Sequence, residues 1–337
     1  MTKSANRSLT IADADIAPGE HATIDIPVAD LYTGTSVNMP VSVICGRRPG
    51  PVLFVSAAIH GDELNGVEII RRLLRRRRLS TIRGTLIAVP VVNVHGFLNQ
   101  SRYLPDRRDL NRSFPGSPKG SIAARLAHTF LTEIVSKADY GIDLHTGAIN
   151  RSNLPQIRAN LDEDETLPLA RAFGAPVIID AELREGSLRE HASEFGIPVL
   201  VYEAGEALRF DELCIRGGLR GITNVMRSIG MLPPSKRKVE LNPVQASAMR
   251  WVRAPSSGIV NWLVELGDSV TCNQRLATVS NPLGDQQEDL LAPVDGIVIG
   301  RSNLPLAHEG DAMANIAEFQ SVARAEGRVE EFVAVHD

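Results

Sequence analysis

Two histidines and a glutamate follow apolar runs in a pattern that suits a zinc site. His60 and Glu63 lie three residues apart at the end of the run 52–59, and His145 ends a second run that begins at Tyr140. Imidazole and carboxylate groups both bind zinc, and a catalytic zinc keeps three protein ligands and one position for water. Each segment alone also fits a surface pair or a buried histidine in a turn, so the combination carries the interpretation.

Two further carboxylates stand at comparable positions. Asp143 precedes His145 by two residues, so both side chains point to the same face of a strand, and Asp143 is expected to orient the imidazole. Glu203 ends the apolar run 198–202 and is the candidate general base that takes a proton from metal-bound water. Glu206 is a rival base, but it lies past the turn and is expected to be solvated.

An arginine-rich loop follows the apolar run 85–92. Arg102 and Arg112 are suited to a substrate carboxylate, which a guanidinium binds with two hydrogen bonds, or to a carbonyl oxygen that must be polarised. Asp109 and Asn111 stand between them. The alternative interpretation is a charged surface loop.

These candidates need a sheet whose strand ends meet at one edge. The apolar runs lie at 52–59, 85–92, 140–144, 176–179 and 198–202. Helical stretches alternate with them at 62–78, 121–137, 162–173, 187–195 and 210–229. This alternation predicts an α/β fold with a mainly parallel or mixed sheet flanked by helices. Ligands bind beyond the carboxyl ends of such strands, where the candidate side chains stand.

A second, β-rich region is expected after a linker near Pro233 and Pro234. The heptapeptide that starts at Ala254 returns in similar form at Ala292, and a Gly–Asp pair follows each copy. Two such half-units predict a small C-terminal all-β barrel. The expected organisation is a tail with edge strands over 1–44, a hydrolase domain over 45–235 and the barrel over 245–320.

Taken together, four segments resemble the succinylglutamate desuccinylase/aspartoacylase family in order and spacing. They are His60–Glu63, Asp109–Arg112, Asp143–His145 and Glu203–Gly205. The resemblance covers residues 45–230 and implies the zinc carboxypeptidase-like fold. The C-terminal repeat is similar to the biotinyl/lipoyl-like domain, whose carrier members attach their cofactor to a lysine. No lysine follows Lys238, so neither lipoate nor biotin is expected.

The resemblance also implies a role for each candidate. One zinc ion per chain would be held by His60, Glu63 and His145. Glu203 would act as the general base and later pass its proton to the leaving amine. Arg102 would polarise the scissile carbonyl. The substrate-binding candidates are Asp109, Asn111 and Arg112.

The predicted function is therefore that of a zinc-dependent amidohydrolase that removes the acyl group of a small N-acyl amino acid or related amine. A metallocarboxypeptidase acting on short peptides is the alternative among enzymes. A non-catalytic metal-binding protein is the alternative outside enzymes. A carboxylate at position 203 favours catalysis, because a metal-binding protein has no need of a base there.

Composition excludes several other classes. Lys plus Arg is 36 and Asp plus Glu is 40, so no basic excess points to nucleic acid, and the arginines of 71–78 are interpreted as an exposed helix face. No apolar run is long enough to cross a membrane. Three widely spaced cysteines indicate a reducing compartment, so a cytoplasmic location is expected. The expected partner is a small molecule, and the resemblance allows a homo-oligomer.

Overall fold

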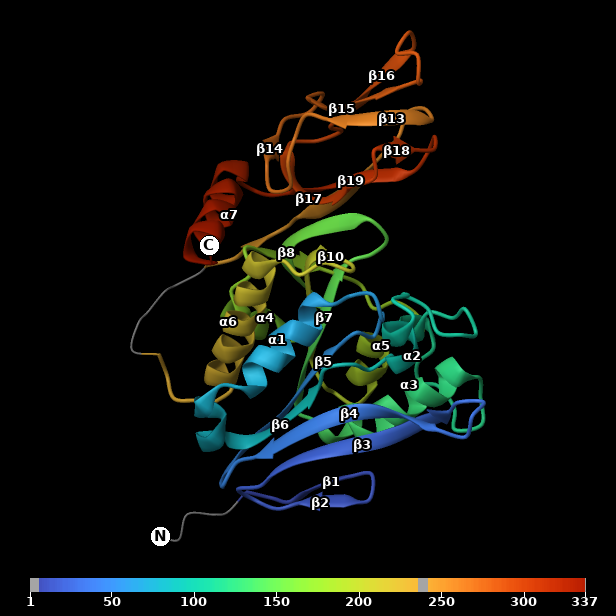
Figure 1. Ribbon diagram of the computed structural model, residues 1–337. Coiled ribbons are helices and arrows are strands. Elements are labelled where there is room, and N and C mark those ends of the chain that lie inside the picture. The colour runs from blue at the N-terminus through green and yellow to red at the C-terminus, as the bar shows by residue number, and fades with distance from the viewer. Residues whose placement is uncertain (1–5, 236–241, 337) are drawn as a thin grey trace.

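The structure is a computed structural model that describes residues 6–235 and 242–336, and a large mixed sheet runs through it (Figure 1). The main strand order is β12-β19-β17-β8-β10-β7-β5-β6-β4-β3. Its centre consists of four parallel neighbours: β6 (Arg83–Val89), β5 (Arg48–Ala57), β7 (Tyr140–Gly147) and β10 (Val199–Glu206). Their carboxyl ends meet at one edge, as the alternating pattern predicts.

Antiparallel strands complete the N-terminal side of this sheet. β3 (His21–Asp30) forms the edge and pairs with β4 (Ser36–Cys45), which in turn pairs with β6. A small separate hairpin consists of β1 (Leu9–Ile11) and β2 (Ala14–Ile16). The expected edge strands are thus present, although β4 lies inside the sheet.

Helices cover both faces of the sheet (Figure 1). One face carries α1 (Asn65–Leu74), α4 (Thr166–Phe173) and α6 (Glu212–Ser228). The other carries α2 (Val94–Leu98), α3 (Ile122–Glu133) and α5 (Leu188–Glu194). Short 3-10 turns lie at Arg77–Thr81, Leu110–Arg112 and Val135–Lys137. Side-chain oxygens of Ser121, Ser187 and Asp211 cap α3, α5 and α6, because the first N–H groups of a helix have no partner within it.

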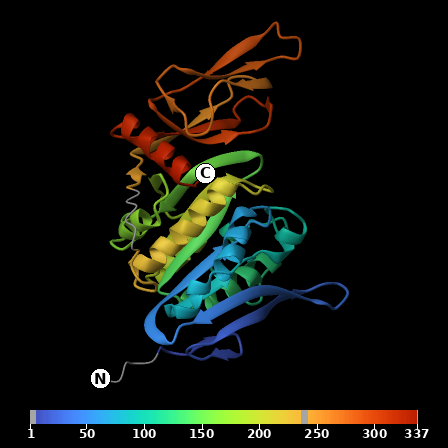
Figure 2. The same ribbon diagram turned by 60° about the vertical axis from the view of Figure 1, so that its left-hand side comes forward.

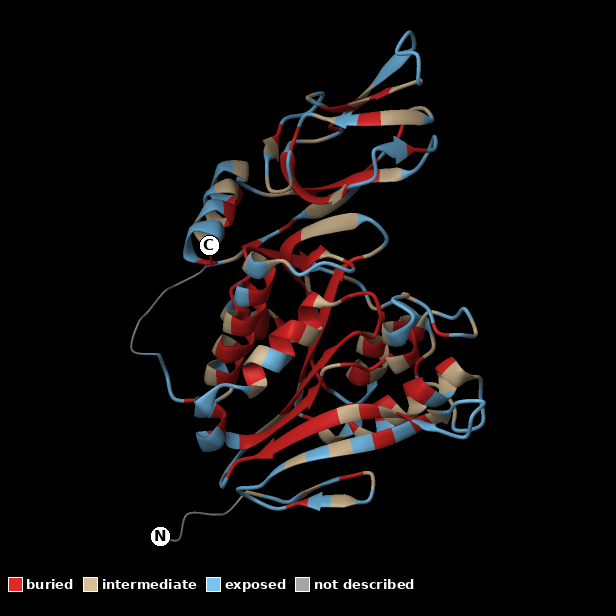
Figure 3. Ribbon diagram, in the orientation of Figure 1, coloured by how far each residue is buried: buried red, intermediate tan, exposed pale blue. Residues whose placement is uncertain are grey.

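Burial on both faces explains the uninterrupted apolar runs. In β5, Leu53 and Val55 belong to the core under α1 and α6, whereas Phe54 belongs to the core under α3. All three side chains have no exposed surface. Figure 3 shows the same burial through the central strands. A strand covered by helices on both sides has no polar face, so its sequence does not alternate.

The predicted helices and apolar strands of the N-terminal region are all present, but the hairpin of β1 and β2, the short helix α2 and one strand of the large sheet were not predicted. β8 (Arg151–Ala159) pairs antiparallel with β10 and parallel with β9 (Val177–Asp180). The sequence hides β8 because polar residues and Pro155 interrupt it. In α1, Arg71 and Arg72 both bond Glu68, which agrees with an exposed cationic helix face.

The C-terminal strands form two layers. The first layer orders β16 (Gln287–Leu291), β15 (Arg275–Ser280), β13 (Gly258–Trp262) and β18 (Leu306–Ala307). The second contains β12 (Ala248–Arg253), β19 (Ala312–Glu318), β17 (Gly296–Ser302) and β14 (Ser269–Val270). Both layers contribute to one apolar core, which includes Val252, Val260, Leu276, Val298 and Ile316.

A closed barrel and a separate all-β domain are not confirmed. β17 pairs with β8, so the second C-terminal layer continues the large sheet instead of closing on the first. Within the described part of the chain, the strand pairings therefore leave both layers open. The strand β11 (Val244–Gln245) also pairs with β9 across the boundary. Sequence periodicity reveals strands but not which distant strand completes their hydrogen bonds.

The C-terminal helix α7 (Val322–His336) returns to the N-terminal region, as Figure 2 shows. Phe332 packs against Gly217 of α6, where a Cβ would lie 2.4 Å from the ring. The predicted linker starts at Pro233 and runs into 236–241, which lie outside the described residues. None of the described helices combines the length and apolar character needed to span a membrane.

Candidate active site

The first two candidate ligands lie on the turn between β5 and α1. His60 and Glu63 are buried, with 4% and 1% of their surface exposed. The turn packs directly on α2: a Cβ on Gly61 would lie 1.9 Å from the carbonyl carbon of Gly96 and 2.1 Å from the nitrogen of Phe97. Glycine is therefore required at position 61 for close approach of two backbones.

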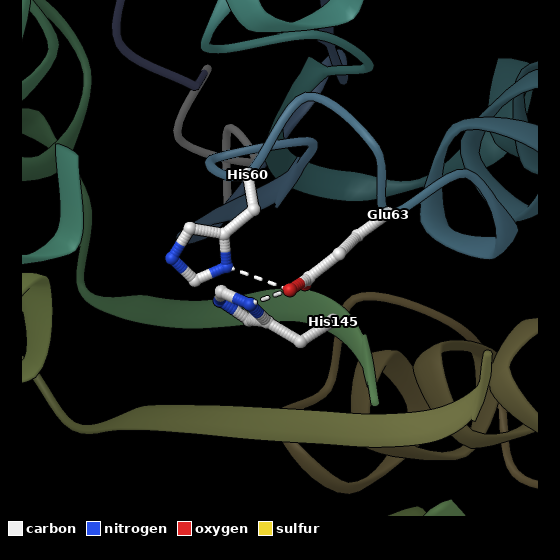
Figure 4. A group of neighbouring side chains, drawn as sticks. All are labelled: His60, Glu63 and His145. Atoms are coloured by element: carbon white, nitrogen blue, oxygen red, sulfur yellow. Dashed lines mark hydrogen bonds and ion pairs between the residues drawn. The ribbon is translucent and has the colours of Figure 1, made fainter. Parts of the chain in front are cut away.

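The third candidate, His145, reaches the same point from β7. The three side chains form the metal-donor cluster (His60, Glu63 and His145), in which one ligand atom of each lies within 4.8 Å of the others. Glu63 Oε1 lies 2.7 Å from His60 Nδ1, and Glu63 Oε2 lies 2.8 Å from His145 Nδ1 (Figure 4). Two imidazoles and one carboxylate around one point match a catalytic zinc site.

A chain of hydrogen bonds fixes His145 from behind. Its Nε2 lies 2.6 Å from Oδ2 of Asp143, and the hydroxyl of Ser56 donates to Oδ1 of Asp143 at 2.7 Å. Ser56 and Asp143 face each other across β5 and β7 and are fully buried. Asp143 thus takes the orienting position expected from the sequence, and it leaves Nδ1 of His145 for a ligand.

A second carboxylate holds His60. Asp109 Oδ1 lies 3.0 Å from His60 Nε2, and Asp109 Oδ2 accepts a hydrogen bond of 2.9 Å from Arg102 Nη2. The other end of the guanidinium lies 3.2 Å from Glu63 Oε1 and 3.1 Å from His60 Nδ1. Asp109 and Arg102 therefore adjoin the metal-donor cluster.

The charges of the site depend on one another. Burial alone would lower the pKa of His145, but the carboxylates of Asp143 and Glu63 outweigh it and raise the pKa well above its ordinary value. Burial alone would raise the pKa of Glu63, but the two imidazoles outweigh it and hold the pKa far below its usual range. The surroundings therefore favour the ionised form of the Glu63 carboxylate and the protonated form of the His145 imidazole.

Glu203 stands on β10 directly opposite His145 of β7. In-register residues of parallel strands share a face, so Glu203 faces the same side of the sheet as the cluster. Its side chain is 21% exposed. Oε2 accepts a hydrogen bond of 2.6 Å from Asn153, and Oε1 lies 3.7 Å from Nε of Arg158. The rival Glu206 instead accepts a hydrogen bond from Asn303 of the C-terminal region.

The remaining substrate-binding candidates lie on the arginine-rich loop. The side-chain oxygen of Asn111 accepts a hydrogen bond of 2.9 Å from the backbone nitrogen of Leu188, which ties the loop to α5. Arg112 is exposed, and its guanidinium donates to the backbone carbonyl of Asn111. The structure therefore places Asp109 against the cluster and Arg112 at the surface of the loop.

Sequence reasoning missed three residues that contact the candidate side chains. Ser56 donates a hydrogen bond to Asp143, and nothing in the local sequence marks it as a partner of that carboxylate. Asn153 and Arg158 lie on the unpredicted strand β8 and flank Glu203. Their polar side chains between apolar residues were the only available signal, and it did not identify a strand.

Comparison with known proteins gives consistent relatives. The chain is 29% identical over 326 residues to an N-alpha-acetyl-L-2,4-diaminobutyric acid deacetylase from Halomonas elongata, covering 89% of this chain and 91% of that protein. A succinylglutamate desuccinylase/aspartoacylase structure from Rhodobacter sphaeroides shares 26% identity with a TM-score of 0.79, covering 89% and 95% of the two chains. A product-bound ectoine utilization protein from Ruegeria pomeroyi shares 25% identity with a TM-score of 0.80 and the same coverage.

The family model "Succinylglutamate desuccinylase/Aspartoacylase catalytic domain" matches residues 49–229. This span is more than half of the chain and contains the metal-donor cluster, Arg102 and Glu203. The mixed α/β fold agrees with that of the solved relatives. The chain therefore belongs to the succinylglutamate desuccinylase/aspartoacylase family.

Proposed function

We propose that this chain is a zinc-dependent deacylase that hydrolyses the amide bond of a small N-acyl amino acid or related acylated amine. The enzyme belongs to the hydrolases of carbon–nitrogen bonds other than peptide bonds, as its family and relatives do. One observation carries the proposal: two imidazoles and a carboxylate meet within 4.8 Å, and Glu203 faces them from the neighbouring strand.

The donor set fits one zinc ion per chain. His60, Glu63 and His145 would hold it, with Asp109 and Asp143 fixing the imidazole rings. When bound, zinc supplies a Lewis acid that lowers the pKa of a bound water to about 7. A catalytic zinc with three protein ligands would keep its fourth position for water or substrate.

The chain's own residues account for the proton transfers and the developing charge. Glu203 removes a proton from the attacking water and later gives it to the leaving amine, so one carboxylate serves both steps. The guanidinium of Arg102 lies beside Glu63 and His60, where its positive charge stabilises the negative charge that develops on the carbonyl oxygen.

Substrate selection is assigned to the loop. Asn111 and Arg112 would bind a substrate carboxylate, since a guanidinium binds carboxylates with two hydrogen bonds. Both carboxylate oxygens of Asp109 are hydrogen-bonded, one to His60 and one to Arg102, so its part in substrate binding would be indirect. The relative from Halomonas elongata is named for a small acetylated amino acid, which supports substrates of that size.

The proposal also covers the domain organisation, the location and the assembly of the protein. We retain a hydrolase domain over 45–235 and a biotinyl/lipoyl-like region over 245–320 without lipoate or biotin. We also retain a cytoplasmic location and a homo-oligomer, with no nucleic acid or membrane as partner. These points rest on the sequence and do not alter the chemistry of the site.

The test is a free-amine release assay across N-acetyl, N-succinyl and N-formyl amino acids, with a dipeptide panel beside it. The expected result is hydrolysis of at least one acylated amino acid, loss of activity with a chelator and recovery with zinc. Hydrolysis of dipeptides alone would favour a metallocarboxypeptidase. Zinc binding without turnover of either panel would favour a non-catalytic metal-binding protein.

A further inference from the structure

The base candidate Glu203 is held by a residue from a different strand. Asn153 of β8 donates a hydrogen bond of 2.6 Å to Glu203 Oε2. Arg158, on the same strand, lies 3.7 Å from the other carboxylate oxygen. A hydrogen bond to a charged group is among the stronger ones in proteins, and it limits the rotamers of the acceptor. The orientation of Glu203 thus depends on β8.

A break in the pairing of β8 and β10 brings Asn153 to this position. Gln156 pairs with Glu203, but Asn153 pairs with Gly205, so two residues of β8 lie opposite one residue of β10. The extra residue reverses the alternation and turns Asn153 to the face of Gln156 and Glu203. Pro155 lies inside this bulge, where its missing N–H breaks no regular pairing.

The other edge of β8 is held by the C-terminal region. Gly300 of β17 pairs with Asn153, and a Cβ on Gly300 would lie 3.2 Å from Oδ1 of Asn153. Asn303, directly after β17, donates to Ser152 Oγ at 2.7 Å and to Glu206 Oε2 at 2.9 Å. The C-terminal region therefore contacts both strands that carry Asn153 and Glu203.

We propose that Asn153 is a positioning residue that orients Glu203, and that strand β17 keeps Asn153 in place. The C-terminal region would then support catalysis through the general base. This inference rests on the proposed function, because it takes Glu203 as the base. It also assigns a task to β17, which the family match at 49–229 does not include.

A double-mutant cycle tests the action through Glu203. Asn153→Ala should lower kcat about tenfold, as expected for a lost hydrogen bond to a charged group, with KM changed less than twofold. In the Glu203→Gln background the same substitution should change kcat less than twofold. Asn153→Asp keeps the shape but repels the carboxylate, so it should lower kcat further than alanine does.

Three results would overturn the inference. These are equal effects of Asn153→Ala in both backgrounds, a raised KM with unchanged kcat, or full activity of both Asn153 variants. Failure of the proposed function looks different: the unaltered protein would hydrolyse none of the N-acyl amino acids, or Glu203→Gln would itself retain activity. Zinc content and melting temperature are measured for each variant. If Asn153→Ala unfolds, Asn153→Asp takes its place in the cycle.

A matched pair of variants tests the contribution of β17. Asn303→Ala removes the bonds to Ser152 and Glu206 and should lower kcat about threefold, as weaker coupling through the backbone implies. The control is Asn281→Ala, which removes comparable side-chain bonds in the β15–β16 turn of the same region. Equal kcat values for the two variants would contradict a role of β17 in positioning Asn153.

Discussion

The metal-donor cluster and the arginine-rich loop differ in how firmly their side chains are held. In the cluster, each imidazole has its second nitrogen within 3.0 Å of a carboxylate, and every donor is buried. On the loop, Arg112 is exposed and bonds the backbone of its neighbour Asn111. We therefore propose chemistry for the strand ends and for Arg102 and Asp109, which the loop turns toward them, and selection for the exposed part of the loop at Arg112.

This difference has a physical reason. A reacting metal needs ligands fixed to a fraction of an ångström, and buried carboxylates with no competing water provide that. A selecting residue must exchange water for substrate, so an exposed guanidinium suits it. Substitutions at the strand ends should therefore affect metal binding and turnover, whereas substitution of the exposed Arg112 should affect substrate affinity.

The largest expected effect on turnover is that of Glu203→Gln. The amide keeps the shape of the side chain but cannot accept the proton, so kcat should fall about a thousandfold. Zinc content should stay unchanged, because Glu203 is not among the donors. Steady-state kinetics with metal analysis check this. The isosteric partner Glu206→Gln serves as the control, and equal losses in both variants would contradict the assignment.

A smaller effect is expected from Asp143→Asn. The amide cannot hold the imidazole N–H of His145 as a carboxylate does, so zinc affinity should fall 10- to 100-fold, about the range for such partners. Chelator competition measures this affinity. Ser56→Ala is the graded comparison, since it removes only the bond to the other oxygen and should cost less. An unchanged affinity in Asp143→Asn would show that the ring needs no support.

On the loop, Arg112→Ala should raise KM about tenfold and leave kcat nearly unchanged, because a charged hydrogen bond to the substrate is lost before the reaction begins. Arg108→Ala, which removes an exposed arginine of the same loop, is the matched control. Initial rates over a range of substrate concentrations separate the two constants. A fall in kcat at constant KM would move Arg112 from selection to chemistry.

The last expected effect is a dependence of zinc affinity on pH. Since the carboxylates of Asp143 and Glu63 raise the pKa of His145 against the lowering effect of burial, its imidazole binds a proton more tightly than an ordinary histidine does before zinc binds. Zinc must displace this proton, so affinity should rise with pH by about tenfold per unit until the raised pKa is passed. Calorimetry in buffers of different ionisation enthalpy counts the protons released, and none released would contradict the coupling.

The sequence alone predicted the buried strands and the site residues at their ends, because burial on both faces leaves a recognisable apolar pattern. Strands such as β5 and β7 are covered on both faces, so their apolar runs are uninterrupted and the polar residues that follow stand out. His60, Glu63, His145 and Glu203 all stand at such strand ends. Asp143 was identified as a support for His145 because two residues along a strand always share a face.

The contacts around His60 and Glu203 and the pairing of the C-terminal strands could not be predicted, because they join segments that are distant in the sequence. Asp109 reaches His60 across 49 positions, and Asn153 reaches Glu203 across 50, so neither contact has a local signal. β8 was not predicted, because its bulge and Pro155 break the alternation of polar and apolar residues that identifies strands. The repeat in the C-terminal region predicted β-structure but not the pairing of β17 with β8, which joins both regions in one sheet.

The most direct measurement is the zinc content of the purified chain and of its His145→Ala variant, both prepared without chelator. We expect about one zinc per chain in the first and a loss of tightly bound zinc in the second, at unchanged secondary structure. His191→Ala is the control, since His191 pairs with Glu194 on α5 and has no place among the donors. A His145→Ala protein that keeps its zinc with the original affinity would contradict the proposed centre.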